Sequence, residues 1–132
     1  MSSLEITSSQ IQGDVTAIIL HVKGQLDRNT DEQLLDRARQ SYEDGMRHLQ
    51  LDLSDVEMVT SSGLHALHTL FRMFTPQNEL DFMHTHRDQP YKSPYFKIVC
   101  PSAQIYYVLN ITGFVQNIFI FNNMDDAVKS FG

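Results

Sequence analysis

The stretch Leu51-Asp-Leu-Ser-Asp-Val-Glu-Met-Val-Thr-Ser-Ser-Gly-Leu64 decides the fold of this chain. It begins as a buried strand, crosses a short turn, and reaches two serines and a glycine that open an amphipathic helix. Unpaired N–H groups and the positive end of the helix dipole favour a negative group in the first turn of a helix. Ser61 and Ser62 therefore occupy a position that suits a reversible phosphate, and equally a plain N-cap serine.

Strand and helix patterns alternate on both sides of this stretch. Strands are expected over residues 4–10, 15–23, 48–53, 96–100 and 115–121, and helices over 30–45, 61–76, 102–113 and from 123 onward. A turn at Gly13-Asp14 makes the first two strands a hairpin. The order predicts an α/β fold: one open, mixed, mostly parallel sheet with an antiparallel edge hairpin and about four helices packed on it.

Local signals refine three of these elements. Thr30 with Gln33 three residues later predicts a capping box at the start of the helix over 30–45. Ser102 and Asn123 are the expected N-caps of the two later helices. A buried stripe is expected on the helix that follows the two serines, and its members are Leu64, Leu67, Leu70, Phe71 and Phe74.

Residues 75–95 are the exception to this regular pattern. The segment is polar, contains Pro76, Pro90 and Pro94, and has no clear hydrophobic period. It is therefore expected to be a long loop. The whole chain, residues 1–132, is otherwise expected to form a single domain, because its length suits one hydrophobic core.

Composition restricts the compartment and the partners. The net charge is −6 and no basic cluster occurs, which argues against nucleic acid as a partner. No leader pattern opens the chain and no apolar run approaches the ~20 residues of a membrane helix, so a cytoplasmic protein without membrane insertion is expected. The single cysteine, Cys100, lies in an apolar run and is expected to be a buried thiol.

The sequence offers only weak candidates for catalytic or metal-binding residues. His65 and His68 share a helix face, but no cysteine or carboxylate follows at metal-ligand spacing, so a solvated or partner-facing surface is favoured. Asp27 and Asp55 fit turn and cap positions better than acid–base roles. No phosphate loop, metal-ligand set or catalytic triad signature is present, so neither an enzyme nor a cofactor is expected.

Three motifs, taken in order, carry a resemblance to a known family. They are Gly24-Gln-Leu-Asp27 before the first helix, the stretch from Leu51 to Leu64, and Tyr107-Val-Leu-Asn-Ile-Thr-Gly-Phe114 at the end of a later helix. With this order of elements the chain resembles the STAS domain family of anti-sigma factor antagonists. The resemblance extends over nearly the whole chain except residues 75–95.

The resemblance implies a bacterial transcription regulator that is a phosphoprotein. Such a protein binds an anti-sigma factor that is also a serine kinase, and so releases a sigma factor. The kinase phosphorylates the antagonist and ends the binding, and a serine phosphatase resets it. Carried onto this chain, the phospho-acceptor is Ser61, with Ser62 as the alternative, and Thr60 stands where the family has aspartate.

The resemblance also implies a partner-binding surface. Its residues are Gly24, Leu26, Asp27, Thr60, Ser61, Ser62, Gly63 and His65. Two other functions remain open for a chain of this kind. One is a STAS-like accessory subunit of a membrane lipid ABC transporter, and the other is a small-ligand or nucleotide-binding STAS module.

Overall fold

The computed structural model describes residues 4–12, 15–111, 113 and 116–130. In chain order the elements are β1 (Leu4–Gln12), β2 (Thr16–Leu26), α1 (Asp31–Glu43), β3 (Leu49–Val59), α2 (Ser61–Phe74), α3 (Gln77–Thr85), β4 (Ser93–Val99), α4 (Ala103–Ile111), β5 (Ile118–Phe121) and α5 (Met124–Lys129). Within the described ranges, no helix combines the length and the apolar character that crossing a membrane requires.

The strands form one sheet in the order β1-β2-β3-β4-β5. β1 pairs antiparallel with β2, and every other neighbouring pair is parallel. This confirms the predicted mixed, mostly parallel sheet with an antiparallel edge in a single α/β domain. The expected turn at Gly13-Asp14 lies outside the described residues, as do parts of the motif around Gly113.

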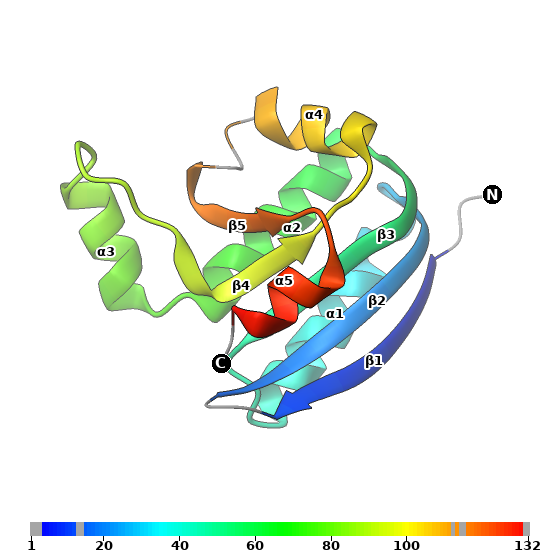
Figure 1. The fold of residues 1–132 in the computed structure, drawn as a ribbon, viewed down its shortest axis with the longest axis horizontal. Coiled ribbons are helices and arrows are strands. Elements are labelled where there is room, and N and C mark those ends of the chain that lie inside the picture. Colours follow the sequence, from blue (N-terminus) through cyan, green and yellow to red (C-terminus); the bar gives the residue numbers. More distant parts are fainter. Residues whose placement is uncertain (1–3, 13–14, 112, 114–115, 131–132) are drawn as a thin grey trace.

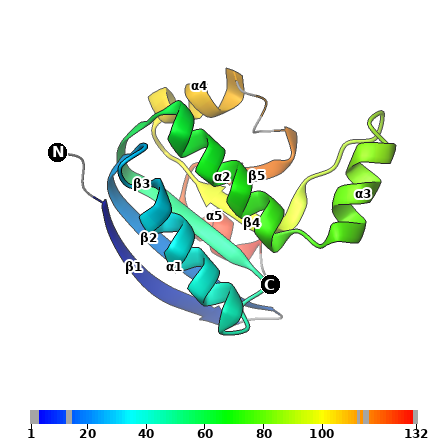
Figure 2. The ribbon, with the colours of Figure 1, turned by 180° about the vertical axis from the view of Figure 1, so that it is seen from behind.

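The helices cover both faces of the sheet. α1 and α2 lie side by side on one face (Figure 2), and α5 lies on the opposite face against β4 and β5 (Figure 1). The two crossovers through α1 and α2 leave from adjacent parallel strands, so the uniform handedness of such connections brings both helices to one face. α4 lies at the same end of the sheet as the start of α2.

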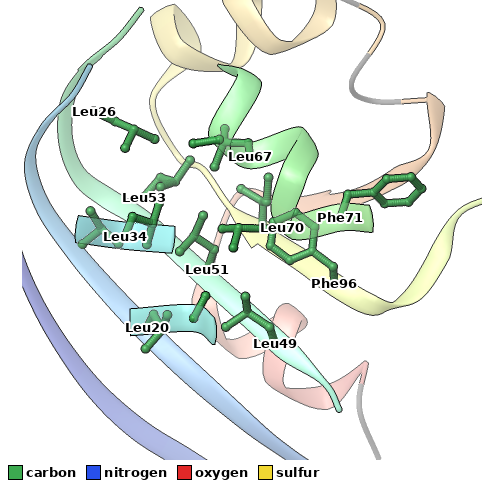
Figure 3. Packing of buried hydrophobic residues seen from close by; sticks show 14 of the residues in the cluster. Leu20, Leu26, Leu34, Leu49, Leu51, Leu53, Leu67, Leu70, Phe71 and Phe96 are labelled. Atoms are coloured by element: carbon green, nitrogen blue, oxygen red, sulfur yellow. The ribbon is translucent and has the colours of Figure 1, made fainter. Parts of the chain in front are cut away.

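The main core lies between the sheet and the pair α1 and α2 (Figure 3). Leucines dominate it because α2 and the centres of β2 and β3 each present an apolar face there. Leu67, Leu70, Phe71 and Phe74 of α2 are buried as predicted, whereas Leu64 is half-buried. Cys100 is also buried, which confirms the interpretation of this thiol as a packing group.

β2 and β3 extend beyond their predicted ends. β3 continues from Leu53 to Val59, so the expected turn within this stretch is wrong, and β2 includes residues 24–26, which had been expected in a loop. β2 and β3 remain paired because the register shifts twice, between His21 and Lys23 and again between Gly24 and Gln25. Gly24 has a φ of 122°, which a residue with a side chain rarely adopts.

The predicted capping box at α1 is wrong. The Thr30 side chain makes no capping hydrogen bond, and the Gln33 amide reaches across to the carbonyl oxygen of Leu4 at 2.8 Å. The two later caps are confirmed. The hydroxyl of Ser102 accepts from the N–H of Ile105 at 3.3 Å, and Asn123 accepts from the N–H of Asp126 at 2.9 Å.

Residues 75–95 are not one long loop. They contain α3, which projects from one side of the domain (Figure 1), and the first residues of β4. Pro76 opens this helix instead of only closing α2, and Leu80 is buried. The hydroxyl of Tyr91 donates to the carboxylate of Glu79 at 2.8 Å and ties α3 to the segment that leads into β4. Burial and this carboxylate raise the pKa of Tyr91.

Leu67→Ala should lower the free energy of unfolding by about 2–5 kcal/mol, because Leu67 is fully buried and its truncation leaves a cavity. Leu64→Ala, one turn earlier and half-buried, should cost less. Urea denaturation of both variants measures the difference. A cost below about 0.5 kcal/mol for Leu67→Ala would mean that α2 packs through another face.

Candidate functional site

The candidate site lies where the carboxyl ends of β2 and β3 meet. Leu26, the last residue of β2, pairs with Val59, the last residue of β3. The next residue, Thr60, donates its N–H to the carbonyl oxygen of Leu26 at 3.0 Å. The end of β2 is thereby fixed against the start of α2.

A glycine allows this close approach. Gly63 lies in the first turn of α2 and is buried. A Cβ atom at this position would lie 2.5 Å from the carbonyl oxygen of Leu26, a distance that real Cβ atoms essentially never show. The absence of a side chain therefore lets the first turn of α2 lie directly on the backbone of β2.

Thr60 is the N-cap of α2. Its backbone is extended, with φ −92° and ψ 179°, and its hydroxyl accepts from the N–H of Gly63 at 3.4 Å. Because Thr60 takes this role, neither serine serves as the N-cap. Ser61 is exposed and Ser62 is half-buried, and neither hydroxyl bonds to another described residue. The first turn of α2 contains no acidic side chain.

The turn after β2 is held by Thr30. Its hydroxyl donates to the carbonyl oxygen of Gln25 at 2.7 Å and accepts from the N–H of Asp27 at 3.0 Å. Asp27 is buried, and its carboxylate accepts from the N–H of Asn29 at 2.9 Å. These bonds explain why Thr30 does not cap α1. The spacing from Asp27 to Asn29, which is typical of an Asx turn, was the available sequence signal for this turn.

The structure brings all the predicted site residues to one end of the sheet but exposes them unequally. Ser61 and His65 are exposed, and Gly24, Thr60 and Ser62 are half-buried. Leu26, Asp27 and Gly63 are buried. Met58, which is not among the predicted site residues, is a large apolar side chain that is 42% exposed just before this site.

A second polar arrangement lies on the sheet face opposite α1 and α2. The hydroxyl of Ser9 lies 3.1 Å from Nε2 of His21, and Nδ1 of His21 lies 2.8 Å from the carboxylate of Asp52. The connectivity is that of a Ser-His-Asp triad. Ser9 lies in a strand of the sheet, however, and in a strand the backbone N–H groups lie in the plane of the sheet. In the described residues of β1 and β2 they therefore do not form the pair of donors that an oxyanion hole above the Ser9 hydroxyl would require. The arrangement joins β1, β2 and β3.

Asp52 is the member of this arrangement whose pKa is shifted by folding. Partial burial alone would raise the pKa of Asp52, but hydrogen bonds from Ser54 and His21 outweigh it and hold the pKa below its usual value. Asp52 is therefore ionised near neutral pH, and its carboxylate lies 2.8 Å from Nδ1 of His21.

A cavity of about 650 Å³ lies between β5 and the start of α4. Its lining is aromatic, apolar and neutral polar, and consists of Cys100, Pro101, Ser102, Ala103, Tyr106, Tyr107, Asn110, Ile120, Phe121 and Asn122. Burial raises the pKa of the Cys100 thiol, so this group stays protonated near neutral pH. Within the described residues, no cluster of three or more His, Cys, Asp or Glu side chains could hold a metal ion.

Comparison with known proteins places this geometry in context. The family model of the STAS domain matches residues 7–82, more than half of the chain. No curated protein matches the sequence. Solved structures do match. An anti-sigma factor antagonist from Mycobacterium paratuberculosis is 20% identical, with a TM-score of 0.72 over 96% of this chain and 94% of that one.

Two more distant structures share the fold. The Bacillus cell fate determinant SpoIIAA in its phosphorylated form is 11% identical, with a TM-score of 0.59 over 95% of this chain and 97% of that one. An uncharacterised protein with a SpoIIAA-like fold from Shewanella loihica is 11% identical, with a TM-score of 0.54 over 100% and 96%. At these identities the matches establish a shared SpoIIAA-like fold.

Gly63→Ala should lower the free energy of unfolding by about 1–3 kcal/mol, because the new methyl group forces α2 away from the Leu26 carbonyl. His65→Ala, an exposed change in the next turn, should stay within about 0.5 kcal/mol of the parent protein. Thermal and urea unfolding measure both. Full stability of Gly63→Ala would show that the contact between α2 and β2 is not tight.

Asp52 should make stability depend on pH in acid. A carboxyl whose pKa is lowered by folding stabilises the native state above its unfolded pKa of about 4, and this contribution is lost as pH falls through the folded pKa. The stability difference between the parent protein and Asp52→Asn should therefore shrink below pH ~4. Asp36→Asn, which breaks an exposed pair with Arg39, should matter less. A difference for Asp52→Asn that is constant with pH in urea titrations would contradict this.

Proposed function

Because this chain belongs to the STAS domain family, we propose that it is an anti-sigma factor antagonist. It acts by binding, without catalysis of its own, as one domain in the bacterial cytoplasm. Its partner is an anti-sigma factor that is also a serine kinase, and occupation of that partner releases a sigma factor. Phosphorylation of Ser61 ends the binding, and a serine phosphatase restores it.

One observation supports this proposal above the others. Ser61 is exposed in the first turn of α2, and its hydroxyl makes no hydrogen bond to another described residue, because Thr60 holds the N-cap. A kinase can therefore reach the hydroxyl without breaking the start of the helix. One of the solved structures that share this fold is itself a phosphorylated form.

The local electrostatics suit a phosphate at this position. A phosphoserine carries roughly −1.5 to −2 charges near neutral pH. The N–H groups and dipole of α2 stabilise such a group, and no acidic side chain in the first turn opposes it. The fold should accept the modification, so its effect falls on the surface around Ser61.

The partner-binding surface has an exposed part and a supporting part. Ser61 and His65 supply exposed side chains, and Gly24, Thr60 and Ser62 are partly accessible beside them. Met58 extends the surface with apolar area of the kind that is enriched in interfaces. The buried residues of the predicted set, Leu26, Asp27 and Gly63, hold these groups in place.

Thr60 distinguishes this chain from relatives that have aspartate at the same place. Its hydroxyl caps α2 as a carboxylate would, so the helix begins normally. Unlike aspartate, Thr60 supplies no negative charge beside the Ser61 hydroxyl that would attack the phosphate donor. Phosphorylation should therefore be slower here, and Thr60→Asp should speed it.

A small-ligand-binding STAS module is the second candidate function. The cavity between α4 and β5 favours it, because about 650 Å³ and a lining without charged side chains suit a neutral ligand of ordinary size. Mass spectrometry of the protein purified from its native host tests this candidate. A stoichiometric small molecule would favour the module over the phosphorylation switch.

Ser61→Asp should leave the free energy of unfolding within about 0.5 kcal/mol of the parent value and weaken binding to the kinase by about tenfold or more. Ser61→Ala should bind and remain unmodified. The measurements are urea unfolding, calorimetric titration with each anti-sigma factor kinase of the source organism, and a phosphorylation time course that includes Thr60→Asp.

Ser62→Ala is the matched control for these variants, since it removes the neighbouring hydroxyl from the same turn. It should be phosphorylated like the parent protein. Phosphate found on Ser62 alone would overturn the assignment of Ser61. Failure of every kinase to bind or modify any of the proteins would reject the antagonist and favour the ligand module.

A further inference from the structure

A second cavity, of about 330 Å³, lies between the C-terminal half of α2 and α3. Phe71, Leu80 and Met83 form its apolar part. Phe71 and Leu80 are buried, and Met83 packs against the core. The cavity lies in the angle between α2 and α3, which projects from the side of the domain (Figure 2), at the far end of α2 from Ser61.

The remaining lining residues are hydrogen-bond donors or cations. They are His68 and Arg72 of α2, and Gln77 and His84 of α3. His68 and Arg72 are one helical turn apart, so both project toward the same side of α2. The cavity therefore combines an apolar floor with a rim that carries positive charge.

Arg72 and His84 are available to a ligand. Neither side chain makes a hydrogen bond or ion pair with another described residue. Two carboxylates of α3 have partners of their own: Glu79 accepts from Tyr91 at 2.8 Å, and Asp81 accepts from the amide of the lining residue Gln77 at 2.9 Å. Arg72 is therefore the fixed positive charge that the lining offers to a ligand.

We propose that this cavity binds a small organic anion with a carboxylate or phosphate head and a short apolar body. The guanidinium of Arg72 presents a planar fork of donors that matches either head group. His68 and His84 add donors at the rim, and the contact with Phe71, Leu80 and Met83 removes the apolar body from water. The volume is at the lower end of the range for ligand sites, so the body is about one ring in size.

A metal ion is a poorer occupant of the same cavity. The lining offers only two imidazoles and no carboxylate or thiolate, and Arg72 repels a cation. Partial burial, Arg72 and His65 all lower the pKa of His68, which keeps this ring neutral near pH 7. As a neutral ring it still donates one hydrogen bond, so the fixed charge at the rim comes from Arg72.

The test is a titration of the full chain, labelled with ¹⁵N, followed by NMR. The probes are benzoate and phenyl phosphate. Inorganic phosphate represents the head group alone, and benzyl alcohol represents the apolar body alone. Saturable shifts around His68, Arg72 and Leu80, with millimolar dissociation constants for at least one aromatic anion and weaker binding of both fragments, are expected. The preferred anion identifies the head group as carboxylate or phosphate.

Arg72→Gln should weaken the binding of the aromatic anion by about tenfold, because it removes the charge-assisted hydrogen bonds. Arg87→Gln is the matched control: Arg87 is exposed just beyond α3, does not line the cavity, and its loss changes the net charge equally. The control should bind like the parent protein. Absence of saturable shifts with both aromatic anions, or equal affinity of the two variants, would overturn the proposal. So would inorganic phosphate binding as tightly as phenyl phosphate.

Discussion

The carbonyl oxygen of Leu26 is the contact on which the candidate site depends. It accepts the N–H of Thr60 at 3.0 Å, and Gly63 packs over it where no side chain could fit. These two contacts hold the end of β2 and the start of α2 together. Through them the exposed hydroxyl of Ser61 acquires a fixed position relative to the turn that Thr30 organises. The buried residues of the site therefore determine the geometry that the exposed ones present.

The order of elements could be predicted because it depends on burial, which leaves a periodic pattern. The stripe of Leu67, Leu70 and Phe71 on α2 follows from helical spacing alone. The full lengths of β2 and β3 could not be predicted, because their pairing passes through two register shifts that break the alternation. α3 was missed because nine residues with one buried side chain leave too weak a period.

The sequence could predict that the candidate site residues lie together, but not which contacts each of them makes. Residues 24–27 and 60–63 lie at the carboxyl ends of β2 and β3, and these ends meet at one end of the sheet because the two strands are parallel. The choice that Thr30 makes between capping α1 and bonding to Gln25 depends on the distance to a strand end, which a local pattern does not contain. The triad-like contact of Ser9, His21 and Asp52 likewise joins three strands, and its members are 12 and 31 residues apart in the sequence.

The length of α2 has a consequence for how the two ends of this helix communicate. Ser61 and Arg72 stand about 16 Å apart along the axis. Ionic screening at physiological salt weakens interactions between exposed charges beyond about 8 Å. The electrostatic interaction between an anion bound at one end of α2 and an anion at the other is thus nearly abolished by screening. Coupling between the two ends would therefore require a displacement of the whole helix, and the close contact of Gly63 with β2 leaves little room for one.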